Sequence, residues 1–394
     1  MAGRGARWIV AGCAVLLVLG IAAETLLRAR SSVVGASHAG GAVDAVLPVM
    51  QQIKMQEAAG QVTYASDPAL GALMAPGRTD VIDTPEFKYT LQTDHAGFPN
   101  REPWPSEVDV AVLGDSLLIG PGIGFDGQFT TLLSERLGGR TILNFGVPGA
   151  GTEHQLRVYR KFVAPLRPRV VIATIWITWD VDNSLQFNRW LAEKSSMDFT
   201  EYRFTFGDTH PVSTQAGPSS LERLGTALRG FLSRSYLLKA IYLRIKSPAA
   251  GDPHVERVAF PNGETVLLAV RDEDRLAMGL ERPGAPDASE VFFNPLVQLR
   301  NEVEAQGGRF VIVFVPSKEE LYAAESFPDV LRSWREASLG FGARQLPVLD
   351  LYPILRQQGR ARPLFFHIDA HLNRAGNQVV ADALSSWISL ATAE

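Results

Sequence analysis

From Val108 onward the sequence alternates short apolar runs with longer segments whose apolar residues recur at helical spacing. Short runs without polar interruption are typical of parallel strands that are covered on both faces. Parallel neighbours need crossover connections, and these connections are right-handed. The alternation therefore predicts a doubly wound α/β fold around a five-stranded parallel sheet. The predicted strands are Val108–Gly114, Thr141–Phe145, Val170–Ile177, Arg309–Val315 and Val348–Leu351.

The segments between these strands carry recognisable helix signals. A residue that favours a helix start precedes each apolar stripe, and glycine pairs follow two of the stripes. We therefore predict four helices that cover the sheet. They are Gln128–Leu137 capped by Asp126, a helix opened by the capping box Thr152-Glu153-His154-Gln155, a helix from Asn294 and Pro295 to Gln306, and Arg374–Leu390.

The alternation stops between the third and fourth strands. The segment at about 184–294 contains an amphipathic helical run, Leu221–Ile245, and a hairpin pattern, Arg257–Ala269, that turns at Pro261-Asn262-Gly263. Connections within a sheet are normally short, so this segment is predicted to be a helical and hairpin insertion. It either forms a lid over a cleft or packs on the membrane-proximal side of the domain.

The N-terminal residues have the pattern of a membrane anchor. An uninterrupted apolar run extends from Trp8 to Ala23. Extended to Leu27 it covers 20 residues, about the length that a helix needs to cross a bilayer. Arg4 and Arg7 precede the run, which favours a cytoplasmic N-terminus and a body outside the membrane. The sequence predicts a single-pass signal anchor in the inner membrane with a periplasmic body. A cleaved signal peptide is the alternative.

These features divide the chain into three parts. Residues 1–30 are the predicted transmembrane anchor. Residues 31–86, rich in Ala, Gly and Ser, are expected to be a stalk with a loosely packed helix around Val43–Ala58. Residues 87–394 are the predicted α/β domain, which begins with a β-segment at Tyr89–Gln92 and includes the insertion.

Composition limits the partners. The formal net charge of −4 gives no basic footprint, which argues against nucleic acid as the main partner. With Cys13 as the single cysteine, the chain can form no internal disulfide. The sequence has no zinc-ligand spacing, phosphate loop or dinucleotide glycine pattern, so we expect no metal and no cofactor.

Ser116 is the first candidate for chemistry. It follows the first strand, preceded by Gly114 and Asp115, and ligands of open α/β sheets bind beyond the carboxyl ends of the strands. A serine attacks an ester well only when a base takes its proton. Serine and aspartate also favour turns, so the Gly-Asp-Ser sequence is weak evidence by itself.

A histidine and an aspartate near the C-terminus provide the base and its orienting carboxylate. Asp369 and His371 precede the last predicted helix and are two positions apart, so both side chains can point into one cleft. His367 and His154 are alternative bases, and Asp369 could instead only cap the last helix. The glycine-rich turn Asn144–Gly151 leaves the second strand at the same edge and could supply backbone donors to an oxyanion.

These motifs resemble signature blocks of the SGNH (GDSL-type) hydrolase superfamily. The blocks are Gly114-Asp115-Ser116, the Asn144–Gly151 turn and Asp369-x-His371 followed by Leu372-Asn373. Asp94–Phe98 and Val315–Glu319 further resemble segments of bacterial envelope members related to alginate O-acetylation proteins. The resemblance implies a flavodoxin-like sheet, Ser116 as nucleophile and His371 as a base oriented by Asp369. It also implies an oxyanion hole from the backbone N–H groups of Ser116 and Gly149.

The chain departs from the superfamily pattern in one block. Members usually carry an asparagine after the third strand that completes the oxyanion hole, whereas Thr178-Trp179-Asp180 stands here. The indole N–H of Trp179 could donate in its place, or Asn183 could be recruited. The one-residue spacing between Asp369 and His371 is the one that the O-acetylation relatives show.

Three further residues are candidate substrate contacts. Asp115 and Asn144 belong to the blocks above, and Lys318 could meet an anionic sugar or an acyl donor. A Lys-Glu pair after a strand is also typical of a solvated helix start, which is the alternative for Lys318.

The sequence thus predicts an outward-facing serine esterase that acts on ester groups of an envelope or exported glycan, with O-acetyl as the expected ester. An O-acetyltransferase that receives acyl groups from a membrane acyl-donor protein is one alternative. A non-catalytic glycan-binding or assembly subunit with a degenerate site is the other. A small soluble ester is the alternative substrate.

Overall fold

The computed structural model describes residues 61–84, 86–193, 199, 202, 254–270 and 288–391. Within them a five-stranded sheet has the order β11-β10-β7-β5-β6, and all neighbouring strands are parallel. The predicted α/β fold with a five-stranded parallel sheet is confirmed. The strands are β5 (Val110–Gly114), β6 (Ile142–Gly146), β7 (Val170–Ile175), β10 (Arg309–Phe314) and β11 (Val348–Asp350).

The register places the carboxyl ends of the central strands at one edge. Gly114 at the end of β5 pairs with Gly146 at the end of β6, and Phe314 of β10 pairs with Ile175 of β7. The chain runs from β5 to β6 on one side and then crosses to β7 on the other side. The end of β5 is therefore the switch point at which α/β sheets bind ligands.

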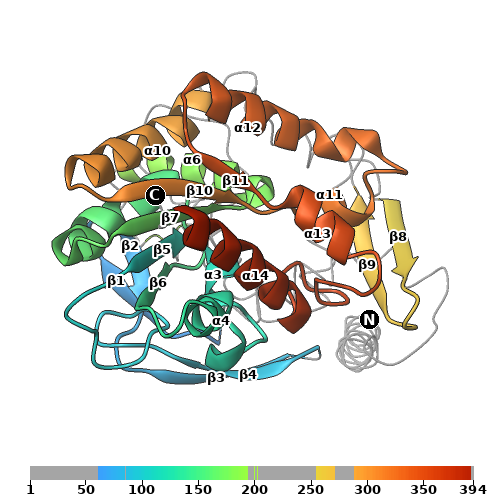
Figure 1. Ribbon diagram of the computed structural model, residues 1–394, viewed down its shortest axis with the longest axis horizontal. Helices are drawn as coiled ribbons and strands as arrows, with labels where there is room; N and C mark the ends of the chain where they lie inside the picture. The colour runs from blue at the N-terminus through green and yellow to red at the C-terminus, as the bar shows by residue number, and fades with distance from the viewer. Residues whose placement is uncertain are drawn as a thin grey trace, which may run out of the picture.

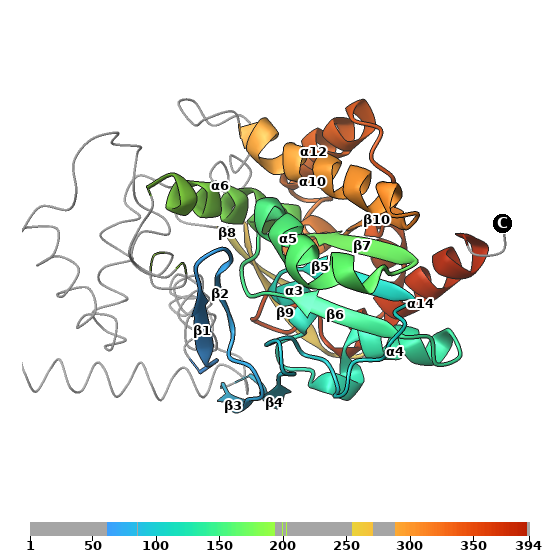
Figure 2. The ribbon, with the colours of Figure 1, turned by 90° about the vertical axis from the view of Figure 1, so that its left-hand side faces the viewer.

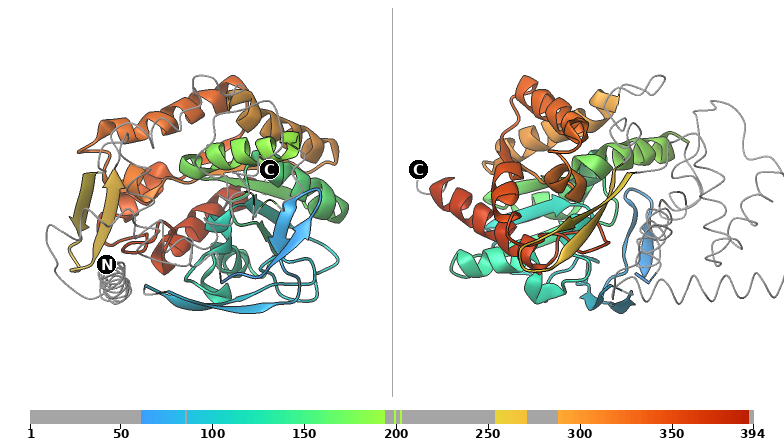
Figure 3. Two further views of the ribbon diagram at one scale, coloured as in Figure 1. Left: turned by 180° about the vertical axis from the view of Figure 1, so that it is seen from behind. Right: turned by 90° about the vertical axis from the view of Figure 1, so that its right-hand side faces the viewer.

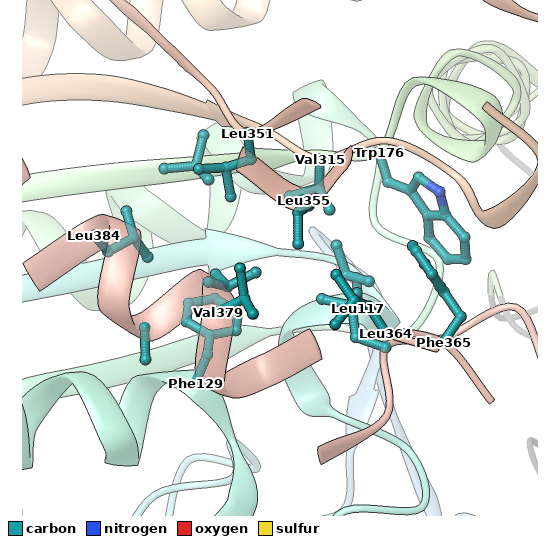
Figure 4. Packing of buried hydrophobic residues seen from close by; sticks show 14 of the residues in the cluster. Leu117, Phe129, Trp176, Val315, Leu351, Leu355, Leu364, Phe365, Val379 and Leu384 are labelled. Carbon is teal, nitrogen blue, oxygen red and sulfur yellow. The ribbon is translucent and has the colours of Figure 1, made fainter. Parts of the chain in front are cut away.

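Helices cover both faces of the sheet (Figures 1 and 2). Alternate strand residues point to opposite faces, so Val112 lies in one apolar core and Leu113 in the other. Figure 4 shows part of the first core, where Phe129, Val379 and Leu384 pack together. That core is covered by α4 (Phe129–Arg136), α13 (Tyr352–Gln358) and α14 (Arg374–Ala391), and the second by α5 (Thr152–Val158), α6 (Ile177–Glu193), α10 (Ala288–Ala305) and α12 (Arg332–Ala343).

Three predicted helix starts are wrong, and the first two concern α4 and α5. Asp126 lies in a 3₁₀ turn, Phe125–Gly127, and Gln128 precedes α4 without a side-chain cap. Thr152 does not cap α5 but is its first residue, and its hydroxyl lies 3.2 Å from Ser184 Oγ.

The helix predicted to begin at Asn294 and Pro295 begins earlier, at Ala288, so Pro295 lies inside α10. A proline in a helix leaves the carbonyl four residues before it without its helical donor. Here that carbonyl belongs to Val291, and the hydroxyl of Thr152 on α5 donates to it at 3.5 Å. A tertiary hydrogen bond therefore replaces the missing helical one, which sequence spacing could not show.

The N-terminal part of the described chain forms two antiparallel pairs. The first joins β1 (Tyr64–Asp67) to β2 (Gly71–Met74), and the second joins β3 (Thr79–Asp83) to β4 (Lys88–Gln92). The predicted stalk is therefore wrong for residues 64–83, because Met74 and Ile82 are buried there in a small core. The predicted β-segment Tyr89–Gln92 is confirmed as part of β4. Residues 31–60, with the helix expected around Val43–Ala58, lie outside the described residues.

The predicted hairpin of the insertion is present. β8 (His254–Ala259) and β9 (Thr265–Val270) pair in antiparallel fashion and stand beside α11 (Lys318–Tyr322) and α13, as Figures 1 and 3 show. Phe260, Val266 and Leu268 enter the first core. The helix expected at Leu221–Ile245 lies outside the described residues, and the limits of the insertion stay predictions.

In the part of the chain that the structure describes, none of the helices combines the length and apolar character needed to span a bilayer. The run Trp8–Leu27 lies outside that part, so the membrane anchor stays a prediction.

Candidate active site

Ser116 is the first residue of a short helix, α3 (Ser116–Ile119), directly after β5. Its neighbour Asp115 is buried, and the Asp115 carboxylate accepts a hydrogen bond from the Leu117 backbone N–H at 2.9 Å. This cap fixes the turn from strand to helix and leaves Ser116 half-buried at the edge of the sheet. Asp115 therefore shapes the turn, and its role as a substrate contact stays a prediction.

His371 reaches Ser116 from the loop before α14. Its Nε2 atom lies 2.9 Å from Ser116 Oγ, and its Nδ1 atom lies 2.7 Å from Asp369 Oδ1. Both the His371 and the Asp369 side chains are 7% exposed. The structure thus brings together the three residues predicted to form the reactive centre.

The one-residue spacing between Asp369 and His371 has a local cause. Asp369 Oδ1 also accepts a hydrogen bond from the His371 backbone N–H at 2.8 Å. An aspartate that binds the backbone two residues on forms an Asx-turn. The same oxygen therefore bends the chain and holds the imidazole ring.

The charges of Asp369 and His371 fix the tautomer of the ring. Burial by itself raises the pKa of Asp369, but the charge and hydrogen bonds of His371 outweigh it and hold that pKa below its ordinary value. Burial lowers the pKa of His371, yet the Asp369 charge outweighs this and raises it overall. An ionised carboxylate can only accept, so Nδ1 carries the proton. In the neutral ring Nε2 is then free to accept the Ser116 hydroxyl proton.

Lys318 is wrongly predicted both as a solvated helix start and as a substrate contact. Ser317 does cap α11, in a capping box with Glu320, but the Lys318 side chain is fully buried. Its Nζ donates to the carbonyl oxygens of Ile368 at 2.8 Å and Asp369 at 3.1 Å. The ammonium group is therefore used inside the protein, against the loop that carries Asp369.

Glu86 is a site residue that sequence reasoning missed. It lies between β3 and β4, and its two carboxylate oxygens accept the backbone N–H groups of Ile368 and Asp369, each at 2.8 Å. No motif or spacing around Glu86 marks it, because its partners are more than 280 positions away. Only the fold could reveal this contact.

The predicted oxyanion donors lie on the two turns after β5 and β6. Val147 N–H donates to the Gly114 carbonyl at 3.0 Å, which holds the second turn against the first. Gly149 follows with φ of 69°, a conformation that favours glycine. Among the described residues, the backbone N–H groups of Ser116 and Gly149 donate to no protein acceptor. Their role as oxyanion donors stays a prediction.

Asn144 supports these turns from within. The side chain is buried, its amide donates to the Leu118 carbonyl at 2.9 Å, and its oxygen accepts the Gly146 N–H at 2.9 Å. Asn144 thus ties β6 to α3. It is not available as the substrate contact that the sequence suggested.

Trp179 stands in the place of the missing asparagine, and Trp176 packs against it. Trp179 is half-buried and packs edge-on against Trp176 at 5.9 Å, and Trp176 packs edge-on against His371 at 5.4 Å. Trp176, which sequence reasoning missed, lies beside Phe365 in Figure 4. Asn183 hydrogen-bonds with the buried Asp180. Trp179 as an oxyanion donor stays a prediction.

Asp180 itself serves the backbone. Its Oδ2 accepts the Trp176 N–H at 2.9 Å, which fixes the end of β7 beside His371. Burial, and then the nearby charge of Asp115, hold the pKa of Asp180 well above its ordinary value.

The alternative bases are engaged elsewhere. His154 is buried and stacks on Phe187 at 4.6 Å. His367 Nδ1 lies 2.6 Å from the Thr265 carbonyl of β9. His371 is therefore the histidine that meets Ser116.

One group of side chains, Asp94, His95 and Glu102, is close enough to suggest a metal ion. Asp94 does not fit this role, because its buried carboxylate already accepts four hydrogen bonds. The donors are Ala96 N–H, Phe98 N–H, Asn100 Nδ2 and Trp104 Nε1. His95 and Glu102 form an exposed pair at 2.7 Å. Asp94 thus organises the segment that enters β5.

Comparison with known families now bears on the site. Residues 283–393 match the family model described as "SGNH hydrolase-like domain, acetyltransferase AlgX". The predicted relation to the SGNH hydrolases is confirmed. The matched SGNH segment contains Lys318, Asp369 and His371, whereas Ser116 and Glu86 lie outside it. No curated protein matches the chain.

Solved structures of SGNH and related hydrolases are similar to the chain at low identity. A lipase/acylhydrolase from Enterococcus faecalis is 12% identical, with 71% of this chain and 95% of that chain covered and a TM-score of 0.36. An acetyl xylan esterase, AlAXEase, is 11% identical, with 71% and 99% covered and a TM-score of 0.36. A GDSL-like lipase from Bacteroides thetaiotaomicron is 11% identical, with 74% and 93% covered and a TM-score of 0.34.

Proposed function

We propose that the protein is a serine-dependent SGNH enzyme that removes or transfers ester-linked acyl groups, with O-acetyl groups of an envelope or exported glycan as substrate. One observation carries the proposal. Ser116 Oγ, the His371 ring and Asp369 Oδ1 form a continuous chain with separations of 2.9 Å and 2.7 Å. The match of residues 283–393 to a family model named for an acetyltransferase supports acetyl as the acyl group.

The geometry gives each residue a step. Ser116 Oγ attacks the acyl carbonyl while its proton passes to His371 Nε2, and Asp369 stabilises the imidazolium that forms. Backbone N–H groups of Ser116 and Gly149 would stabilise the oxyanion. When the tetrahedral intermediate collapses, Nε2 returns the proton to the departing alcohol and an acyl-Ser116 ester remains. Water or a glycan hydroxyl then attacks this ester by the same steps in reverse.

Hydrolysis and transfer share the acyl-enzyme and differ only in what resolves it. The proposed location is the outer side of the inner membrane, anchored by Trp8–Leu27, where a membrane acyl-donor protein would be accessible. This location depends on the sequence alone.

Labelling of Ser116 by a serine-directed fluorophosphonate tests the proposal. The full chain should be labelled, and the Ser116→Ala variant should not. The release of free acetate from p-nitrophenyl acetate, measured with and without an acceptor glycan, then separates hydrolysis from transfer. In a transferase the acceptor takes the acetyl group in place of water, so less free acetate forms. A folded protein that binds polysaccharide but is not labelled would be a binding subunit, which Trp179 in place of asparagine would favour.

A further inference from the structure

Two charged side chains from separate parts of the chain hold the loop that carries Asp369. We propose that Glu86 and Lys318, together called the loop clamp, are positioning residues that set Asp369 and thereby the His371 ring. This inference rests on the proposed function of Ser116. It adds two positioning residues to the candidate active site, of which Glu86 lies on the hairpin β3–β4.

Both residues of the clamp bind the backbone of Ile368 and Asp369. Glu86 binds their N–H groups, and Lys318 binds their carbonyl oxygens. Glu86 accepts the N–H groups of Ile368 and Asp369, each at 2.8 Å. Lys318 Nζ donates to the carbonyl oxygens of Ile368 and Asp369 at 2.8 Å and 3.1 Å. Every backbone polar group of these two residues is therefore bound to a full charge.

Such contacts restrict the loop more than neutral ones would. Hydrogen bonds to ionised groups are shorter and roughly twice as strong as neutral ones. Lys318 is fully buried, and Glu86 is half-buried and binds two adjacent N–H groups with its two oxygens. Sliding or rotation of the loop would break several of these bonds at once.

The restriction matters because the loop leads straight into the reactive centre. Asp369 begins the Asx-turn that places His371, and the His371 ring then meets Ser116. A misplacement of about 1 Å at a reacting group can cost about 10²-fold in rate. The clamp should therefore act on kcat more than on KM, because its hydrogen bonds go to the backbone of the loop that carries Asp369.

The hairpin β3–β4 is thus part of the enzyme. The matched family segment, residues 283–393, contains Lys318, Asp369 and His371 but not Glu86. The loop would keep the lysine half of the clamp and lose the carboxylate half if the hairpin were removed. A purely structural role for Glu86, as an anchor of the hairpin, would instead leave the geometry of His371 unchanged.

The test compares Glu86→Gln with Asp83→Asn. The amide replaces one of the two carboxylate oxygens by an NH2 group, which is a donor and cannot accept the N–H that this oxygen bound. Asp83 lies on the same hairpin and forms an exposed ion pair with Lys88 at 2.6 Å, so its variant perturbs the hairpin without reaching the loop. Glu86→Asp is a second variant, because it keeps the charge but is one methylene too short to hold both N–H groups.

With p-nitrophenyl acetate, kcat should fall about 10–10²-fold in Glu86→Gln and less in Glu86→Asp, with KM within about twofold of wild type and Asp83→Asn unaffected. The low-field NMR resonance of the His371 Nδ1 proton should move in Glu86→Gln and stay in Asp83→Asn. A folded Glu86→Gln variant with unchanged kcat and resonance would overturn the inference, and so would loss of cooperative unfolding in both Glu86 variants. If wild type resists fluorophosphonate, the proposed function fails while the resonance still tests the clamp.

Discussion

His371 Nε2 lies 2.9 Å from Ser116 Oγ although the two residues are 255 positions apart. The packing of the surrounding helices holds the two residues at this distance. α14 follows the His371 loop and packs on α4, where the buried Asn377 side chain accepts the Phe129 N–H at 3.0 Å. The loop itself is held by Glu86 and Lys318. The proton path is therefore fixed from both ends before any substrate arrives.

Asp369→Asn should leave the fold intact and remove most of the activity. An asparagine amide can donate to Nδ1, which favours the tautomer with the proton on Nε2 and leaves no base for Ser116. We expect kcat to fall by about 10⁴-fold, as for the equivalent change in a serine protease triad. The residual activity should also titrate at lower pH, because Asp369 raises the pKa of His371. Acetyl ester hydrolysis across pH measures both. Activity within tenfold of wild type would exclude Asp369 as the orienting carboxylate.

Lys318→Met should shift the pH dependence in the opposite direction. Lys318 is a buried cation that lowers the pKa of His371, so its removal favours the imidazolium and raises that pKa. The reaction needs neutral His371, and the acidic limb of the kcat/KM profile should therefore move to higher pH. The exposed residue Lys88 offers the control variant Lys88→Met, which should leave the limb in place. A shift to lower pH would show that loop displacement outweighs the lost charge.

The strands and the reactive residues could be predicted for a common reason. Buried parallel strands need unbroken apolar runs, and their carboxyl ends must meet at one edge, so Ser116 at the end of β5 was placed by pattern alone. Asp369 and His371 followed from their spacing and their position before the last helix.

The missed features all depend on partners distant in sequence. Lysines are mostly exposed, so nothing local indicates that Lys318 would be buried against backbone carbonyls. No sequence motif surrounds Glu86, and its contacts form only when the hairpin β3–β4 packs against the loop that carries Asp369. Pro295 looked like a helix start because the hydroxyl that compensates it comes from Thr152, on another helix.

The contact between Thr152 and α10 leads to a stability prediction. Thr152→Val keeps the shape but removes the hydroxyl that lies between the Val291 carbonyl and Ser184. A buried polar group left unsatisfied costs about 1–3 kcal/mol, so the free energy of unfolding should fall by that amount. Thr152→Ser keeps the hydroxyl and should therefore retain most of the wild-type free energy of unfolding. Urea unfolding measures both variants. Equal stability of the valine and serine variants would show that the hydroxyl does not compensate Pro295.

Glu320 makes stability depend on pH. The side chain is buried and accepts the Ser317 N–H at 2.7 Å, and burial raises the pKa of the carboxyl from 4.5 to about 7. The folded protein therefore binds the proton more tightly than the unfolded chain does. The stabilising contribution of protonated Glu320 is complete below about pH 4.5 and is lost as the pH rises through about 7.

Glu320→Gln should remove this loss. The amide oxygen can still accept the Ser317 N–H, and the side chain stays neutral at every pH. Since each pKa unit corresponds to about 1.4 kcal/mol, the variant should gain up to about 3 kcal/mol over wild type at pH 8 and little at pH 4. Urea unfolding at both pH values measures the difference, with Glu135→Gln as a control, because Glu135 is exposed on α4. A variant that is less stable than wild type at pH 8 would mean that the Glu320 carboxylate is stabilised in the fold, which reverses the sign argued here.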